Sequence, residues 1–174
     1  MAGKGIGVGL IGCGTMGSRL TRAIEELDVG RVVAIWDTAK GPMDSFVDNL
    51  RPRGEKIADE FRGRACSSLD DMLADAEVEA IVVATPDFCH EEPVVAAAGA
   101  GKHVFVEKPL TLTVAEARQA IAAASKAGIV LMVGHHRRRQ GATRRLREML
   151  DKGELGMLHH LEANLSSPIG LKPR

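Results

Sequence analysis

The sequence predicts an α/β protein built on a doubly wound parallel sheet. Over the first 134 residues, short apolar runs alternate with stretches of helical period. Several of these runs are apolar throughout, as are strands that are buried on both faces of a parallel sheet. The chain has 174 residues, of which 45% are hydrophobic and 26% are charged, which is enough for one full core and a little more.

The first half of the pattern consists of a strand over 6–11, a helix over 16–27 and a strand over 31–37. We expect one face of this helix to pack on the sheet through Leu20, Ala23, Ile24 and Leu27. A brief strand near Ala65 and Cys66 follows, and it is flanked by short helices over 54–62 and 68–75.

The second half begins with the clearest strand of the chain, over 78–86, which is stopped by Pro86. A helix is predicted over 91–101, because Pro93 stands in its first turn and glycines stand at its end. The remaining elements are a strand over 103–108, a helix over 113–128 and a strand over 129–134.

The composition of the chain becomes basic after residue 134. A basic helical stretch over 135–156 is followed by a strand-like run over 157–167. We therefore expect residues 1–134 to form one domain, and residues 135–174 to form a linker helix and the first strand of an incomplete second domain. A single strand without a partner cannot close a second core.

Composition excludes several classes of function. Lys and Arg together number 23, as do Asp and Glu, so no net charge attracts the protein to nucleic acid or to an anionic membrane. No apolar run is long enough to span a bilayer, and no secretory signal opens the chain. Three cysteines without a C-x-x-C pair argue against a disulfide framework and against a metal site, and they favour the cytosol.

A cluster of arginines stands in the basic stretch and comprises Arg137, Arg138, Arg139, Arg144, Arg145 and Arg147. Nucleic-acid modules that stack bases need aromatic side chains, but only 3% of this chain is aromatic and it contains no tyrosine. We therefore expect a solvated helix between domains and no nucleic-acid partner.

A glycine-rich segment over 5–17, GIGVGLIGCGTMG, fits the pattern G-x-G-x-x-G in two registers. The dinucleotide-binding form of this pattern needs a strand before it, a helix at its last glycine and an acid about twenty residues further on. The register ending at Gly12 fails, because few residues precede it and Val32 stands at the acid position. The register ending at Gly17 passes, with Asp37 at the end of the next strand.

In this register each glycine has a structural role that only glycine can fill. Gly12 permits a tight turn, Gly14 lets the backbone approach a pyrophosphate, and Gly17 lets the helix pack closely on the strand. The pyrophosphate would lie beside Thr15 and Met16, where the first N–H groups and the helix dipole favour anions. The sequence thus predicts a Rossmann-type NAD(P)-binding fold.

Asp37 also predicts which dinucleotide is bound. Its carboxylate would accept hydrogen bonds from the adenosine ribose hydroxyls and repel a 2′-phosphate, so NAD is favoured over NADP. Thr38 and Lys40 lie nearby and weaken this preference. The other interpretation of the segment is a glycine-rich turn without a ligand. Gly7 and Gly9 are expected to be strand glycines that allow close approach of the backbone.

A second constellation reads ATPDFCHEEP over 84–93 and GKHVFVEKPL over 101–110. Together with GHHRRR over 134–139 and GELGMLHHLEAN over 153–164, it resembles the Gfo/Idh/MocA oxidoreductase family. The resemblance runs from the start of the chain to its last residues. It implies an NAD(P)-dependent dehydrogenase that transfers hydride between nicotinamide and a sugar, an inositol or a related polyol.

The resemblance also implies roles for single residues. Lys108 would lie near the nicotinamide and the substrate, where its ammonium could bond the substrate hydroxyl as the catalytic group. Pro109 would fix the local backbone, through a preceding bond that is often cis in the family, and Glu107 would orient the turn. The alternative for Lys108 is a solvated lysine at a strand end.

Other residues are expected near the same site. Thr85 and Pro86 end a strand at the carboxyl edge of the sheet and should line the cofactor cleft. His90 could approach the nicotinamide, but a capping or packing role is open as well. His136 stands where the family commonly has an asparagine, so its role stays open, as does that of His135.

Family members continue into a second α/β domain, which usually carries an Asp-x-x-x-His pair. No such pair follows Gly134. If the 174 residues are the whole polypeptide, the proton-relay partner is absent, and so is the sheet through which relatives associate into oligomers. A non-catalytic NAD-binding module is therefore the alternative function.

Overall fold

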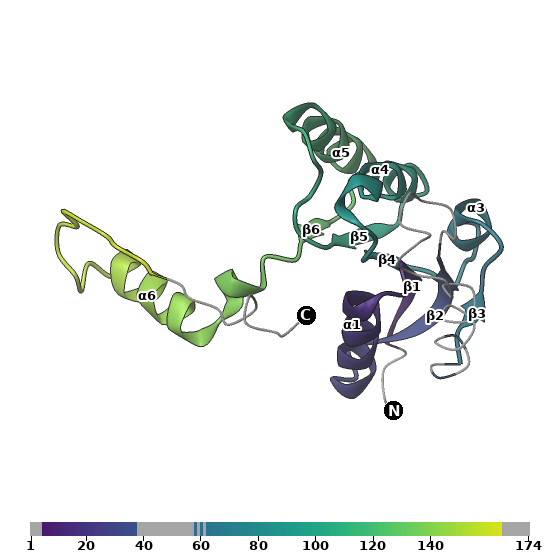
Figure 1. Cartoon of the computed structure of the whole chain (residues 1–174), viewed down its shortest axis with the longest axis horizontal. Helices are drawn as coiled ribbons and strands as arrows, with labels where there is room; N and C mark the ends of the chain where they lie inside the picture. Colours follow the sequence, from purple (N-terminus) through teal and green to yellow (C-terminus); the bar gives the residue numbers. More distant parts are fainter. Residues whose placement is uncertain (1–4, 38–57, 59, 61, 165–174) are drawn as a thin grey trace, which may run out of the picture. The chain divides into compact units, whose positions relative to one another are not determined.

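The computed structural model describes residues 5–37, 58, 60 and 62–164. Its chain divides into two compact units, residues 1–134 and 135–174. The first unit contains a six-stranded sheet in the order β3-β2-β1-β4-β5-β6, and every pair of neighbours is parallel (Figure 1). The strand order reverses between β1 and β4, which is the switch point of a doubly wound sheet. The predicted fold class is confirmed.

The elements of the first unit follow one another in the predicted order. They are β1 (Ile6–Ile11), α1 (Thr15–Glu26), β2 (Gly30–Trp36), β3 (Arg64–Ala65), α3 (Leu69–Leu73), β4 (Ala80–Val83), the 3-10 helix η1 (Asp87–Cys89), α4 (Glu91–Gly99), β5 (His103–Val106), α5 (Val114–Ala127) and β6 (Leu131–Val133). Most of the helix predicted over 54–62 lies outside the described residues.

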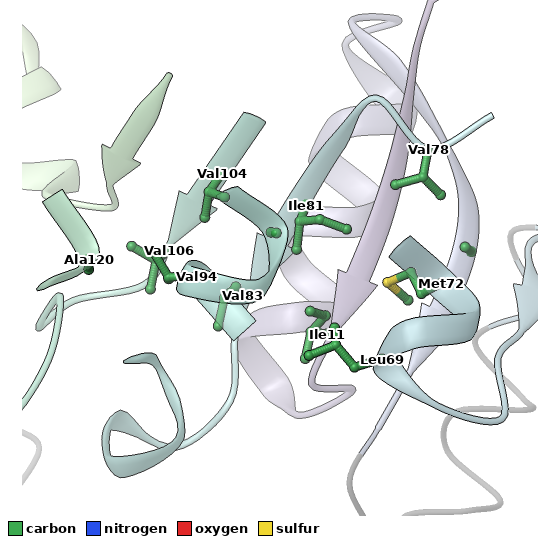
Figure 2. Close-up of a cluster of buried hydrophobic side chains, with 12 residues drawn as sticks. Ile11, Leu69, Met72, Val78, Ile81, Val83, Val94, Val104, Val106 and Ala120 are labelled. Atoms are coloured by element: carbon green, nitrogen blue, oxygen red, sulfur yellow. The ribbon is translucent and has the colours of Figure 1, made fainter. Parts of the chain in front are cut away.

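The sheet is buried on both faces, which explains why its strands are apolar throughout. On β4, Ile81 and Val83 belong to the cluster on one face, whereas Val82 belongs to the cluster on the other. The first cluster packs against α3, α4 and α5 (Figure 2). The second packs against α1, which lies on the opposite side of the sheet (Figure 1).

The face by which α1 packs agrees with the prediction in part, because Leu20 and Ile24 are partly buried against the second cluster. Leu27 caps the helix and is 70% exposed, and Ala23 is exposed as well. The buried residues of the helix are Gly17 and Thr21, whose hydroxyl donates a hydrogen bond of 2.9 Å to the Gly17 carbonyl oxygen. Small residues let the helix approach the sheet closely, so the buried face includes Gly17 and Thr21 beside the predicted Leu20 and Ile24.

The two upstream glycines, Gly7 and Gly9, lie in close contact with neighbouring atoms of the core. A Cβ atom at Gly7 would collide with the carbonyl oxygen of Glu77. A Cβ at Gly9 would lie 2.8 Å from the side chains of both Ile81 and Met72. The close approach of the backbone is confirmed at Gly7, whereas Gly9 faces side chains instead.

The second unit contains the 3-10 helix η2 (His136–Arg139) and α6 (Gly141–Asp151). The strand predicted over 157–167 is wrong for its described part, because residues 157–164 form no strand. A strand is stabilised by hydrogen bonds to a neighbour, and the described part of this unit contains no other strand. No helix in the described part of the chain is long and apolar enough to cross a membrane.

Candidate functional site

Most of the predicted site residues gather at one edge of the sheet. Because all six strands run parallel, the residues that follow their carboxyl ends meet at the same edge. The glycine turn follows β1, and Asp37 follows β2. Thr85 and Pro86 follow β4, and Lys108 follows β5.

The turn after β1 accepts only glycine at two positions. Gly12 has a φ of +93°, and a Cβ there would lie 2.7 Å from backbone atoms of both Ala84 and Thr85. Its N–H donates a 3.0 Å hydrogen bond to the Trp36 carbonyl oxygen. A Cβ at Gly17 would collide with the carbonyl oxygen of Gly12. Both glycines are therefore explained by the protein's own packing.

Gly14 is different, because neither its backbone nor its packing requires glycine. Its φ of −69° and ψ of −172° are open to any residue. A Cβ there would meet no heavy atom of the described residues within 4 Å. Gly14 caps α1, so the missing side chain leaves room directly before the N–H groups of Thr15 and Met16. The open space leaves these N–H groups accessible, which binding of a pyrophosphate at a helix N-terminus requires.

Asp37 lies beside this turn. Its Oδ2 accepts a 2.8 Å hydrogen bond from the backbone N–H of Cys13, which links the end of β2 to the loop after β1. Burial, and then the negative charge of Asp37, raises the pKa of the Cys13 thiol to about 12. The sequence did not predict this contact. The only signal for it is position, since Cys13 directly follows Gly12, the first glycine of the fingerprint.

The loop after β4 is held by local contacts. The Thr85 hydroxyl donates a 3.2 Å hydrogen bond to the Cys89 carbonyl oxygen. His90 is only 1% exposed, and its Nδ1 and Nε2 lie 2.7 Å from the Pro109 oxygen and 3.0 Å from the Thr85 oxygen. Burial leaves the ring no surface for a ligand. The direct cofactor contact predicted for His90 therefore conflicts with the structure, which supports the packing role.

The loop after β5 places Lys108 at the surface. The Lys108–Pro109 peptide bond is cis, as the family resemblance implied, and both residues are exposed. Glu107 is 8% exposed, and its Oε2 accepts a 3.2 Å hydrogen bond from the Lys108 N–H. This bond fits the orienting role expected for Glu107.

The remaining predicted residues lie in α1, before η1 and in the second unit. Thr15 and Met16 are exposed in the first turn of α1, and Pro86 precedes η1. His135 and His136 belong to the second unit. Within the described residues, no group of three or more His, Cys, Asp or Glu side chains is placed to hold a metal ion.

The chain is similar to an inositol 2-dehydrogenase of Saccharopolyspora erythraea, with 35% identity over 170 residues. The match covers 94% of this chain and 47% of that protein. The chain thus spans less than half of the length of this curated relative.

Solved structures show the same similarity. The WlbA dehydrogenase from Bordetella pertussis, in complex with NADH and UDP-GlcNAcA, has a TM-score of 0.76 and 28% identity over 90% of this chain and 42% of its own. KijD10, a 3-ketoreductase from Actinomadura kijaniata in complex with NADP and TDP-benzene, has a TM-score of 0.72 and 29% identity over 86% and 43%.

A match to a protein family identifies the first unit more directly than these single relatives do. Residues 6–135 match the family GFO_IDH_MocA, which is described as an oxidoreductase family with an NAD-binding Rossmann fold. The matched range covers β1 through β6 and every site residue discussed above except His136. The chain therefore belongs to the Gfo/Idh/MocA oxidoreductase family, and its first unit is the NAD-binding Rossmann fold of that family.

Proposed function

We propose that the chain is the nucleotide-binding part of an NAD(P)-dependent dehydrogenase that moves hydride between nicotinamide and the CH–OH carbon of a sugar, an inositol or a related polyol. The observation that carries the proposal is the space at Gly14, between two glycines that packing requires. A relative named as an inositol dehydrogenase and a similar structure that holds a nucleotide sugar support the substrate class.

The start of α1 is suited to the pyrophosphate. Its first turn contains no acidic residue that would repel phosphate, and Gly14 contributes no side chain that would occupy the N–H groups. The helix dipole adds a favourable interaction with an anion, typically 0.3 to about 1 kcal/mol at an exposed terminus. The phosphates would therefore be held by backbone groups of residues 14–17.

We further propose that Asp37 makes the chain prefer NAD to NADP. The hydrogen bond from the Cys13 N–H fixes the carboxylate beside the glycine turn. A carboxylate has about four lone-pair sites, so this bond is compatible with acceptance from a ribose hydroxyl as well. A 2′-phosphate at the same place would bring two negative charges together.

Lys108 is the proposed catalytic residue. A bound nicotinamide supplies the carbon that accepts or gives the hydride. The exposed Lys108 side chain is at the same edge of the sheet as the glycine turn. There its neutral amine can accept the hydroxyl proton when the substrate is oxidised, and the resulting ammonium can return that proton to the oxygen on reduction. Glu107 orients the lysine through the Lys108 N–H.

Calorimetric titration with NAD and NADP tests the cofactor proposal. We expect NAD to bind at least about tenfold more tightly, which corresponds to about 1.4 kcal/mol. Asp37→Asn is the matched variant, because asparagine keeps an oxygen that can accept from the Cys13 N–H but loses the charge. The preference should shrink in this variant. Absence of binding of either nucleotide at millimolar concentration would refute the proposed function, and equal affinities would refute the preference alone.

A kinetic assay tests the role of Lys108. NAD reduction is measured over a panel of sugars and inositols, and Lys108→Ala should lower kcat by roughly 100-fold or more, with little change in the affinity for NAD. A variant that keeps the full rate would remove Lys108 from the mechanism.

A further inference from the structure

His90 is a deeply buried titratable group near the site, and the proposed reaction gives it no role. It stands between η1 and α4, and it is 1% exposed. Its two ring nitrogens are the polar atoms nearest to two backbone carbonyls, which belong to Thr85 after β4 and Pro109 after β5. One side chain thus contacts both loops that border the site.

The chemistry of these contacts is constrained, because a carbonyl oxygen can only accept a hydrogen bond. Each contact therefore needs an N–H on the ring nitrogen concerned. The distance is 2.7 Å at Nδ1 and 3.0 Å at Nε2, so the single N–H of a neutral ring is best placed at Nδ1, facing Pro109. An N–H on Nε2 completes the second bond, to the Thr85 oxygen.

The sheet itself cannot join the two loops at this point. The last backbone bond between the β4 and β5 strands is donated by the Glu107 N–H to the Val83 carbonyl oxygen, at 2.9 Å. Beyond it, Pro86 and Pro109 have no N–H to donate. The Lys108 N–H is engaged by the Glu107 carboxylate. The contacts of the imidazole continue the connection where the backbone ladder ends.

We propose that His90 is a positioning residue, which clamps the Lys108–Pro109 segment to the end of β4 and thereby sets the place of Lys108 relative to Thr85. Its side chain acts through the two carbonyl groups and touches neither cofactor nor substrate. The clamp is a property of the folded chain, and only its effect on nucleotide binding rests on the proposed function.

Three variants separate the two contacts. His90→Ala removes both of them. His90→Asn places an amide nitrogen near the position of Nδ1 and can keep the bond to Pro109, whereas His90→Gln reaches the position of Nε2 and can keep the bond to Thr85. His103→Ala is the matched control, because His103 lies at the opposite end of β5 and its Nδ1 accepts from the Val130 N–H.

Hydrogen exchange of the ligand-free chain is the first measurement. In His90→Ala, the Lys108 and Leu110 amides should exchange about tenfold faster or more, while the amides of β1 and α1 keep their protection. His90→Asn should restore slow exchange at Lys108 better than His90→Gln, and His103→Ala should leave it unchanged. Unaltered exchange at Lys108 in His90→Ala would overturn the proposal. If His90→Ala does not fold, equal exchange at Lys108 in the Asn and Gln variants would overturn it.

Nucleotide affinity is the second measurement, and it uses NADH and ADP-ribose as probes. His90→Ala should weaken NADH by about tenfold, because a small displacement near the nicotinamide is costly, and it should leave ADP-ribose unchanged, since that probe needs only the glycine turn and Asp37. Equal weakening of both probes would contradict a positioning role. A wild-type chain that binds neither probe would refute the proposed function, and the exchange experiment would then decide on the clamp by itself.

Discussion

Two helix N-termini in the first unit are built in opposite ways. At the start of α5, the Glu116 N–H donates to the Thr113 hydroxyl at 3.2 Å, and the Thr113 N–H donates to the Glu116 carboxylate at 3.0 Å. This reciprocal capping box satisfies the helix start with the chain's own side chains. At the start of α1, the cap is Gly14, which has no side chain to offer.

Under the proposed function, this difference separates a terminus that serves the fold from one that is left open for a pyrophosphate. A side-chain cap typically stabilises a helix by about 1 kcal/mol relative to alanine, whereas a glycine cap gives up only a few tenths of a kcal/mol. Such local departures from good helix design are expected at functional sites. The contrast between α5 and α1 thus points to the same edge of the sheet as the glycine pattern does.

Substitution of Gly12 should have the largest effect. Gly12→Ala forces a side chain into a positive φ and against the backbone of Ala84 and Thr85. We expect a loss of about 3 kcal/mol in the free energy of unfolding, measured by urea denaturation. An unchanged midpoint would show that the turn before α1 is not built as described.

Gly14→Ala should separate binding from stability. The added methyl group enters the space before α1, so NAD affinity should fall about tenfold or more, as measured by calorimetry. The free energy of unfolding should change by less than about 0.5 kcal/mol, because the weaker cap and the stiffer unfolded chain offset each other. Full NAD affinity in this variant would contradict the role proposed for the N-terminus of α1.

Thr113→Ala gives the opposite result at α5. Loss of the cap should lower the free energy of unfolding by about 1 kcal/mol and leave NAD affinity unchanged. Thr113→Ser is the control, since serine keeps the hydroxyl. A fall in NAD affinity comparable to that of Gly14→Ala would mean that the two termini do not have separate roles.

The smallest expected effect is a pH dependence of stability at α3, through the carboxyl group of Asp71. The Ser67 N–H, and then the Arg64 side chain, holds the pKa of the Asp71 carboxyl below its ordinary value of 3.8. Because the pKa is lowered in the folded state, its stabilising contribution is complete above pH 3.8 and is lost as the pH falls through the lowered pKa. NMR titration should show the Ser67 amide shifting with Asp71. Arg64→Ala should raise the pKa of Asp71, and an unchanged pKa would contradict the assignment.

Much of the first unit could be predicted from the sequence, because its signals are local. Apolar runs and the glycine spacing predicted the parallel, doubly wound sheet and the order of its elements along the chain. The burial of His90 could not be predicted, because it depends on a carbonyl nineteen residues away. The strand expected over 157–167 failed for a similar reason, since a strand needs a partner that its own residues do not reveal. The cytosolic location and the oligomer stay predictions.

Substitutions at Gly7 and Gly9 should act on folding and not on nucleotide binding. Both belong to a motif-like pattern, yet each is fixed by neighbouring atoms inside the sheet rather than by a nucleotide. A harmful change at either position would reduce the yield of properly folded protein in the cell. Its phenotype should therefore worsen with temperature, and a ligand that binds only the folded chain should partly restore the yield.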